Sequence, residues 1–528
     1  MAKGKSTKKK EVVLRLEDVL FHCRDIMRGK ANGAIQRDVI LTFVFLKFLN
    51  ERFDKQREKV RAELEEAGMP LNPYLDRADG YSKDGVIFID KDCRWQTILE
   101  LPENTRILDL DNIVAKLNNI PRLKGALPAQ IFSNSRIEAK VFKQLAEEVD
   151  KISSNRFHEK DLIGRVYEYF LQAFAINASS KEEGEFYTPH SIVETIAALI
   201  EPFDGSIYDP CCGSGGMFVQ SVKFVEAHGG NTTKVQVFGQ ESDPDSFRLA
   251  KMNLCIRGIS YNLGERNVST FTDDQHKGLL VDYVMANPPF NLKKWRGESE
   301  LLTDLRWSGY DVPPVSNANY AWILHILSHL NKSHGVAGFL LANGALGDTD
   351  TISIRRRLIE NDKVEAIIVL PLEMFYQTDI SVTLWILNNN KRPALWHGRR
   401  LRDRTGEILF VDLRTWNEHI YEKKYVQLVP DQIERVADIY HTWQSLGTDG
   451  KHYAQPELYR SVGIDEIKEN GWSLVPSRYI EFVDRDTNID YDGILRKAAT
   501  LTADIISRQE KNQEALRAAF NALGYGML

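Results

Sequence analysis

From about residue 183 onward, short runs of β-branched and apolar residues alternate with stretches of helical periodicity. This alternation is typical of parallel sheets, because two parallel strands need a crossover connection, usually a helix. The pattern therefore predicts an α/β fold with a doubly wound parallel sheet. The expected strands are 206–209, 235–240, 281–286, 336–342, 364–370 and 381–387, and the helices expected between most of them are 191–201, 216–228, 244–257 and 318–331.

The sequence before this region has apolar residues at helical spacing over 12–67. Its run 39–49 is almost wholly apolar. The length of this run and the charged stretch after it favour a buried helix, and it is about half as long as a membrane span. We therefore expect an α-helical N-terminal domain over 1–180.

The α/β pattern predicts a second domain over 181–420, followed by a mixed C-terminal region over 421–528. A chain of 528 residues is long enough for about three domains. The last stretch, 490–523, carries apolar residues at helical spacing among many charges and predicts a long amphipathic helix. Two roles stay open for this helix, packing on its own domain and docking to a partner helix.

The overall charge limits how the chain could bind nucleic acid. The formal net charge is −6 at pH 7 and the pI is near 6.1, which excludes a chain that is basic over its whole surface. Binding to DNA would need local basic patches or a partner. The N-terminal sequence MAKGKSTKKK lacks the apolar run of a signal peptide, and we interpret it as a solvated tail, with contact to phosphates as the alternative.

The five cysteines form no CxxC pair, and Cys211 and Cys212 are adjacent. Neither a disulfide framework nor a metal site is expected from this spacing. A reducing compartment, the cytoplasm, is the simplest location. We expect Cys211 and Cys212 to pack compactly rather than to act as nucleophiles.

Residues 206–217, SIYDPCCGSGGM, combine a short strand that ends at Asp209 with a loop of small residues and a helix that begins near Gly216. Such a turn lets a ligand approach the backbone and the helix N-terminus. The loop matches neither the phosphate-binding pattern GxxxxGK[ST] nor the dinucleotide pattern GxGxxG. The loop is therefore not read as a phosphate-binding or dinucleotide-binding turn.

The next predicted strand ends at Glu241. A carboxylate at this place can accept hydrogen bonds from both ribose hydroxyls of an adenosine. Together with the glycine-rich loop, Glu241 favours S-adenosylmethionine (SAM). The alternative is structural: the glycines form a tight turn and Glu241 is a solvated acid that caps a helix.

The strand expected at 281–286 ends at Asn287-Pro288-Pro289-Phe290, where ligands bind in an open α/β sheet. An exocyclic amino group on a base is a poor nucleophile, because its lone pair is delocalised into the ring. The Asn287 side-chain oxygen and the Pro288 carbonyl can each accept one of its N–H bonds and favour a pyramidal nitrogen. The prolines keep these acceptors preorganised, and Phe290 offers a face on which the base can stack. The alternative is a proline-rich turn.

No strong general base is required for this chemistry. A sulfonium donor is already activated, and the attacked nitrogen becomes acidic on transfer, so the protein's task is positioning. A stacked base in duplex DNA cannot reach such a site, so a DNA substrate implies base flipping.

With these motifs, the chain resembles the modification (M) subunits of type I restriction–modification systems, which are gamma-class N6-adenine DNA methyltransferases. The resemblance covers nearly the whole chain. It is carried by GRVYEYFLQAFA (164–175), GEFYTPHSIV (184–193), YDPCCGSGG (208–216), FGQESDP (238–244) and NPPF (287–290), and by the segments 16–29, 37–49 and 464–480.

The resemblance implies that 181–420 is a SAM-dependent methyltransferase (Rossmann-like) domain, with NPPF as its catalytic motif. The sequence ERNVSTF (265–271) departs from the family's usual pattern, and Asn267 is the residue that we expect on the adenine side of SAM. Thr188 could also cap a helix that begins at Pro189, and we expect both roles to hold together. The residues expected to contact SAM are Glu185, Phe186, Tyr187, Thr188, Pro189, His190, Asp209, Gly213, Ser214, Gly215, Gly216, Glu241 and Asn267.

The resemblance also implies that Phe375 or Tyr376 helps to hold the flipped base, with core packing as the alternative. The basic stretches 291–297 and 399–404 could contact DNA phosphates, and a solvated surface is an equal alternative for the second.

No segment after 393 is long and basic enough for two target-recognition domains. The family implies that a separate specificity (S) subunit reads double-stranded DNA, that a second copy of M joins the complex, and that a restriction/motor (R) subunit is an option. Two other functions stay open: another NPP[FY] methyltransferase, acting on a protein glutamine or an rRNA guanine, and a catalytically silent scaffold of a DNA complex.

Overall fold

The structure is a computed structural model. It describes residues 15–82, 86–153, 188–375, 381–422, 425–483 and 491–523, and the single positions 157, 162, 165, 166, 169 and 170. The chain forms two compact units, Met1–Ile480 and Glu481–Leu528.

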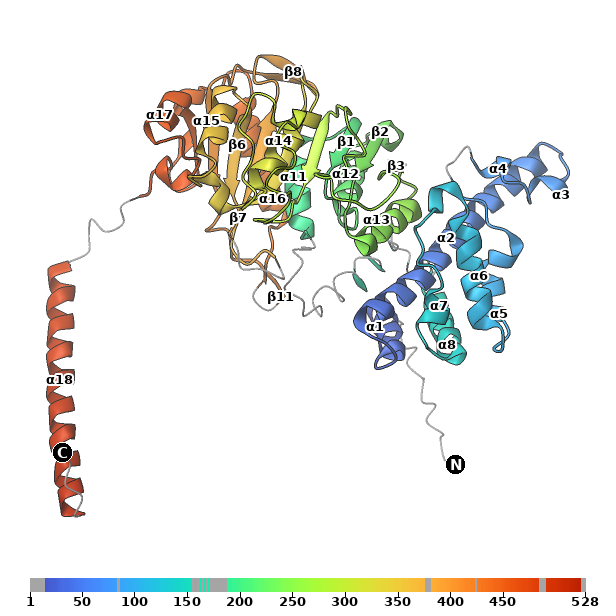
Figure 1. Ribbon diagram of the computed structural model, residues 1–528, viewed down its shortest axis with the longest axis horizontal. Helices are drawn as coiled ribbons and strands as arrows, with labels where there is room; N and C mark the ends of the chain where they lie inside the picture. Colours follow the sequence, from blue (N-terminus) through green and yellow to red (C-terminus); the bar gives the residue numbers. More distant parts are fainter. Residues whose placement is uncertain are drawn as a thin grey trace, which may run out of the picture. The chain divides into compact units, whose positions relative to one another are not determined.

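The N-terminal part of the first unit is helical (Figure 1). The run 39–49 lies inside the second and longest of these helices and is almost wholly buried, which confirms the predicted buried helix. The Asn32 side chain caps this helix by accepting a hydrogen bond from the Ile35 backbone N–H. Among the described residues, no helix is both long and apolar enough to cross a membrane. The helices are α1 (Leu16–Met27), α2 (Gly33–Glu66), α3 (Leu71–Tyr74), α4 (Asp79–Ser82), α5 (Trp95–Glu100), α6 (Arg106–Asn118), α7 (Ile131–Asn134) and α8 (Ala139–Asp150).

A ten-stranded sheet follows, with the strand order β13-β14-β10-β6-β7-β5-β4-β1-β2-β3. All six strands expected from the sequence are present, with ends shifted by two residues or fewer. The strands are β1 (Gly205–Asp209), β2 (Val235–Gly239), β3 (Tyr261–Asn262), β4 (Tyr283–Ala286), β5 (Val336–Ala342), β6 (Val364–Val369), β7 (Val382–Asn388), β10 (Glu407–Asp412), β13 (Ala454–Gln455) and β14 (Tyr459–Gly463).

The sheet is not purely parallel, so this part of the expectation is wrong. Strand β7 runs antiparallel to both of its neighbours, β5 and β6, and β14 runs antiparallel to β10. All seven residues of β7 are buried. A strand that is covered on both faces is apolar throughout whichever way it runs, so the sequence pattern did not reveal its direction.

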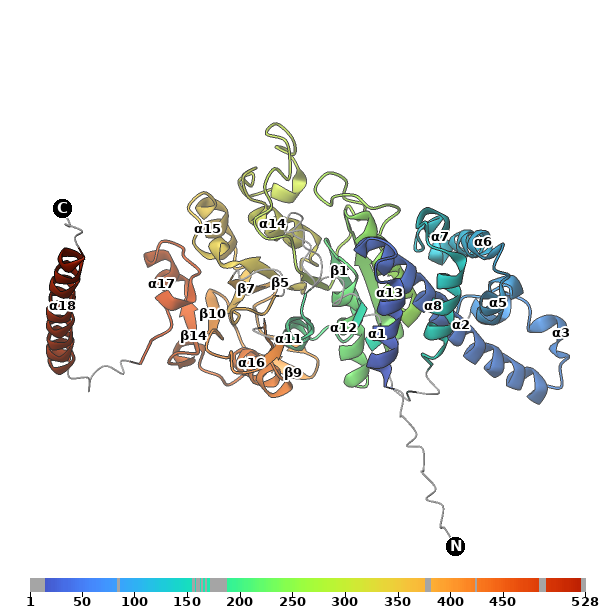
Figure 2. The ribbon, with the colours of Figure 1, turned by 90° about the horizontal axis from the view of Figure 1, so that it is seen from below.

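Helices cover both faces of the sheet, as a doubly wound fold requires. Figure 2 shows α14 and α15 on one side of the sheet and α11, α12 and α16 on the other. Alternate residues of one strand enter different cores: Ile207 belongs to the core that includes α11, α12, α13 and α16, and Tyr208 belongs to the core that includes α14 and α15. These helices are α11 (His190–Ile200), α12 (Gly216–Ala227), α13 (Pro244–Arg257), α14 (Asn319–His329), α15 (Ile352–Glu360) and α16 (Pro430–Gln444).

Helix α13 belongs to two cores at once. Its Leu254 packs with the sheet, whereas Met252 and Ile256 pack with the N-terminal helices. Ion pairs join the same two parts: Arg37 Nη2 lies 2.7 Å from Asp245 Oδ2 at the start of α13. The N-terminal helices therefore support the helix that follows Glu241.

The second unit contains α18 (Tyr491–Ala522), which confirms the long helix expected over 490–523. Its apolar side chains include Leu495, Leu501 and Ile505, and each of these is exposed.

Candidate functional site

Three polar side chains follow neighbouring parallel strands. Asp209 is the last residue of β1, Glu241 comes two residues after β2, and Asn287 comes directly after β4. Strand β1 pairs with β2 and β4 in parallel, with Asp209 opposite Gly239. The carboxyl ends of these strands therefore lie at one edge of the sheet, where α/β folds bind ligands.

Two hydrogen bonds from backbone N–H groups fix the loop after β1. The Cys211 N–H donates to Asp209 Oδ1 over 3.0 Å, and the Cys212 N–H donates to the Gln240 carbonyl over 3.0 Å. Gly213 and Gly215 have φ values of 52° and 78°, a backbone conformation that residues other than glycine rarely adopt. Gly215 is the residue directly before α12, so the free N–H groups at the start of this helix belong to the site.

Glu241 is 9% exposed and accepts three backbone hydrogen bonds. The donors are the N–H groups of Gly213 at 2.8 Å, Ser242 at 2.7 Å and Asp243 at 2.9 Å. Burial raises the pKa of Glu241, although these donors oppose the shift. The alternative of a solvated capping acid is wrong: the cap of α13 is Asp243, whose side chain accepts from the Ser246 N–H. Glu241 instead connects the glycine loop to β2.

Asp209 is 1% exposed. Burial raises the pKa of its carboxyl to about 7, against the effect of the Cys211 N–H. Perturbed carboxyls in clefts are typical of functional sites. The two cysteines of the loop are free, and Cys212 packs in the core of the sheet, as expected for compact packing.

Asn287 has one satisfied and one unsatisfied side-chain atom. Its Nδ2 donates to Thr188 Oγ1 over 2.9 Å, whereas its Oδ1 is buried without a hydrogen-bond partner. The Pro288 carbonyl accepts no hydrogen bond from the described residues either. A buried oxygen without a donor is rare in folded proteins and suggests a missing ligand. Two acceptors are thus available at the edge of the sheet that also carries the glycine loop.

Phe290 meets Phe375 edge to face, with ring centroids 5.8 Å apart and planes at 86°. Phe375 is 2% exposed, so its ring supports Phe290 from the core. A role for Phe375 against a base stays a prediction, and Tyr376 lies outside the described residues. Asn319, at the start of α14, was not predicted from the sequence. Its side-chain oxygen accepts from the Asn291 N–H over 3.1 Å and connects the segment after NPPF to this helix.

The expected contacts before the glycine loop are only partly described, because Glu185, Phe186 and Tyr187 lie outside the described residues. Thr188 does not cap α11, so that expectation is wrong. The N-cap is Pro189, whose carbonyl accepts from the Ile192 and Val193 N–H groups.

His190 begins α11, and its Nδ1 lies 3.2 Å from a Glu194 carboxylate oxygen. Asn267 is exposed and donates to the Ser242 carbonyl over 3.0 Å, beside the turn that holds Glu241. Roles of His190 and Asn267 in binding SAM stay predictions.

The second basic stretch is neither a phosphate-binding nor a solvated surface at two of its arginines. Arg404 pairs with Glu365 over 2.8 Å, and both side chains are fully buried. Arg402 donates to the Trp443 carbonyl over 2.6 Å and pairs with Glu407. A run of basic residues in the sequence does not show whether their partners are DNA phosphates or buried carboxylates.

In the first basic stretch, Lys293 and Lys294 are exposed. Arg296 is 9% exposed and donates to the Gly297, Glu298 and Pro313 carbonyls. Only the two lysines are therefore available for phosphates in 293–296.

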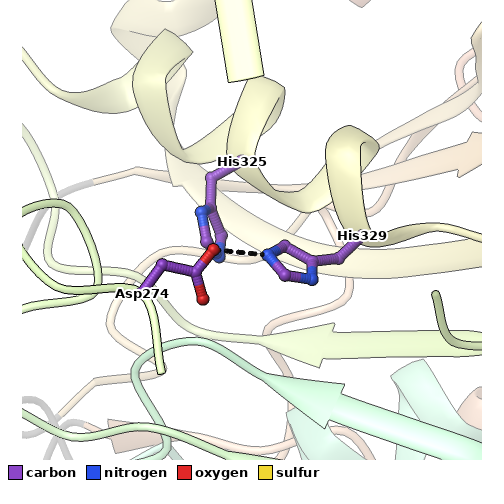
Figure 3. Close-up of side chains that lie close together, drawn as sticks. All are labelled: Asp274, His325 and His329. Atoms are coloured by element: carbon purple, nitrogen blue, oxygen red, sulfur yellow. Dashed lines mark hydrogen bonds and ion pairs between the residues drawn. The ribbon is translucent and has the colours of Figure 1, made fainter. Parts of the chain in front are cut away.

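Asp274, His325 and His329 lie close together, and both histidines are buried (Figure 3). Their ligand atoms lie within 4.8 Å of one another. His329 Nε2 lies 3.0 Å from Asp274 Oδ2 and its Nδ1 lies 2.9 Å from the Leu279 carbonyl. His325 Nε2 lies 3.0 Å from the Tyr208 hydroxyl, and the Arg306 guanidinium is 3.3 Å from Nδ1.

All four ring nitrogens of this cluster have hydrogen-bond partners, and the Arg306 cation opposes a further positive charge. Burial would raise the pKa of Asp274, but the hydrogen bond from His329 lowers it to about 2. We therefore interpret the cluster as a hydrogen-bonded network that joins Tyr208 of β1 to α14.

Comparison with known proteins gives consistent matches. Residues 158–487 match the family described as N-6 DNA methylase, and residues 16–152 match the HsdM N-terminal domain. The MjaIX type I methylase subunit of Methanocaldococcus jannaschii is 31% identical over 98% of this chain and 92% of that protein. The HindI type I methylase subunit of Haemophilus influenzae is 37% identical over 69% of this chain and 79% of that protein.

Solved structures share the fold. A type I restriction–modification methyltransferase subunit from Streptococcus thermophilus is similar with a TM-score of 0.68 at 21% identity, over 88% of this chain and 98% of that one. A modification subunit of a putative type I restriction enzyme from Vibrio vulnificus gives a TM-score of 0.61 at 18% identity, over 89% and 97%.

Proposed function

Because the chain belongs to the N-6 DNA methylase family, among the methylase subunits of type I restriction enzymes, we propose that it transfers a methyl group from SAM to the N6 atom of a flipped adenine in double-stranded DNA. The observation that carries this proposal is the buried, unpartnered Oδ1 of Asn287 at the carboxyl end of β4. The strand that it follows pairs directly with the strand that leads into the glycine loop.

The residues of the loop fit SAM. A Cβ on Gly213 would meet no other atom within 4 Å, so the loop backbone is open there, whereas Gly215 packs against Leu254 and Ala250 of α13. The start of α12 favours a carboxylate such as that of methionine. The Ser242 and Asp243 N–H groups and the Ser242 hydroxyl donate to Glu241 Oε1, and the Gly213 N–H donates to Oε2. A lone pair on Oε2 is therefore left for a ribose hydroxyl. SAM, when bound, supplies a methyl group activated by its sulfonium.

The four residues of NPPF then position the base. We propose that Asn287 Oδ1 and the Pro288 carbonyl each accept one N6–H bond, so that the lone pair of the nitrogen is directed at the donor. Phe290, supported by Phe375, provides a stacking face. The proton lost after transfer needs no strong base, because the methylated nitrogen is already acidic.

We propose that partner subunits, and not this chain, recognise the DNA target sequence. We propose that a separate specificity subunit reads the DNA, as implied by the relatives' description as methylase subunits, that a second copy of this chain is present in the complex, and that a restriction subunit can join it. The exposed apolar side chains of α18 and the N-terminal helices are candidate docking surfaces. The cytoplasm, which holds the cellular DNA, is the proposed location.

The test is transfer of tritiated methyl groups from SAM to unmethylated DNA by the full chain with its specificity subunit. Asn287→Ala should abolish transfer but leave the affinity for SAM within about twofold, because its amide serves the base rather than the cofactor. Asn361→Ala, at the exposed opposite edge of the sheet before β6, is the matched control and should remain active.

Transfer by Asn287→Ala at a rate near that of the wild type would refute the mechanism. Methylation of ribosomes or of a protein glutamine, with DNA left unmodified, would refute the proposed substrate.

A further inference from the structure

The hydroxyl of Thr188 holds one end of the Asn287 amide. Asn287 Nδ2 donates to Thr188 Oγ1 over 2.9 Å, and the other end of the same amide, Oδ1, is buried without a partner. These two residues are far apart in the sequence, so the contact is made by the fold and not by a local turn.

The two ends of an amide are not equivalent for this reaction. The oxygen accepts hydrogen bonds, whereas the NH2 group only donates them. An amino group that must give its N–H bonds to the protein therefore needs the oxygen of Asn287. If the amide rotated by half a turn, its NH2 group would face the amino group of the substrate. Two donors would then meet, and the lone pair of the substrate nitrogen would lose its orientation.

Thr188 is free to hold the amide because α11 does not use its hydroxyl. The helix is capped by the Pro189 carbonyl, and no side chain caps its first turn. The helix itself is fixed in place: Ile196 packs so closely on β5 that a Cβ on Gly338 would lie 2.7 Å from its Cγ2 atom. Thr188 lies two residues before this packed helix, and its hydroxyl contacts Asn287 at the end of β4.

We propose that Thr188 is a positioning residue that fixes the plane of the Asn287 amide at the end of β4. The substrate amino group only donates hydrogen bonds, so it takes the arrangement in which Oδ1 faces the substrate and Nδ2 faces the Thr188 hydroxyl. This inference rests on the proposed function. It differs from a contact between Thr188 and SAM, because an orienting hydroxyl changes the rate of transfer and a cofactor contact changes the affinity for SAM.

The experiment measures single-turnover methyl transfer at saturating SAM, together with SAM affinity, for the full chain in complex with its specificity subunit. Thr188→Val keeps the shape but removes the hydroxyl, and should slow transfer by about 10- to 100-fold, with SAM affinity within about twofold. Thr188→Ala should show the same loss of rate, and it replaces the valine variant in the experiment if that variant does not fold. Thr188→Ser restores the hydroxyl and should recover most of the rate.

Thr195→Val, in the helix that follows Thr188, is the matched control, because the Thr195 hydroxyl donates to the Ser191 carbonyl. It should leave the rate unchanged. A wild-type rate in both hydroxyl-free variants, or a loss of SAM affinity with a normal rate at saturating SAM, would overturn the inference. An inactive wild-type complex, or an active Asn287→Ala variant, would instead count against the proposed function.

Discussion

Replacing Asp209 by asparagine should stabilise the protein at neutral and alkaline pH, and the gain should disappear in acid. The Asp209 side chain is 1% exposed, and burial raises the pKa of its carboxyl to about 7. In unfolded chains this pKa is about 4. A carboxyl with a pKa raised by folding contributes stability below the unfolded pKa and loses it as the pH rises through the folded pKa.

The expected magnitude follows from these two values. The difference between about 4 and about 7 corresponds to about 4 kcal/mol of stability lost between about pH 3 and pH 8. Asparagine has the same shape, carries no charge and keeps an oxygen for the Cys211 N–H, which now donates to Asp209 Oδ1 over 3.0 Å. We therefore expect Asp209→Asn to melt several degrees above the wild type at about pH 8 and at the same temperature at about pH 4.

Melting curves of the full chain over this pH range provide the assay. Asp204→Asn is the matched control, because Asp204 is exposed just before the same strand and its substitution should change the melting temperature little at any pH. A difference between Asp209→Asn and the wild type that does not vary with pH would refute the reasoning. Weaker SAM binding by the stabilised variant would agree with a carboxylate that is kept for function at a cost in stability.

Glu241→Gln should weaken SAM binding by about 10- to 100-fold. The new NH2 group accepts no hydrogen bond, so the side chain cannot serve both the Gly213 N–H and a ribose hydroxyl through the same atom. Calorimetric titration with SAM checks this, and an unchanged affinity would remove Glu241 from the site. Arg404→Met should lower the free energy of unfolding by about 3–5 kcal/mol, because Glu365 would remain charged in the interior. The exposed Arg400→Met should have almost no effect in the same denaturation experiment, and equal losses in the two variants would contradict this explanation.

The position of the site was predictable because a topological rule connects it to the sequence pattern. Asp209, Glu241 and Asn287 each follow a run of apolar residues, and the carboxyl ends of parallel strands meet at one edge. The rule needs only that these strands are neighbours and parallel, which holds for β4, β1 and β2. The antiparallel strand β7 is not a neighbour of these three strands, so its direction did not affect this prediction.

Contacts between distant side chains were not predictable. Arg404 was expected at the surface because its neighbours are basic, and its buried partner Glu365 is on another strand. Thr188 was expected to cap a helix because it precedes a proline, and its hydroxyl instead accepts from Asn287. In both cases the local sequence allows two partners, and only the packing of the sheet selects one.

The same limit explains why the role of the N-terminal helices is visible only in the structure. A change in sequence period marks where helical and α/β patterns begin, but it carries no information on packing between them. Helix α13 has buried apolar residues on several sides, because Leu254 faces the sheet and Met252 faces the N-terminal helices. This helix starts directly after the turn whose N–H groups hold Glu241. The N-terminal helices therefore support, through α13, the turn that holds the residue that we propose to bind the ribose.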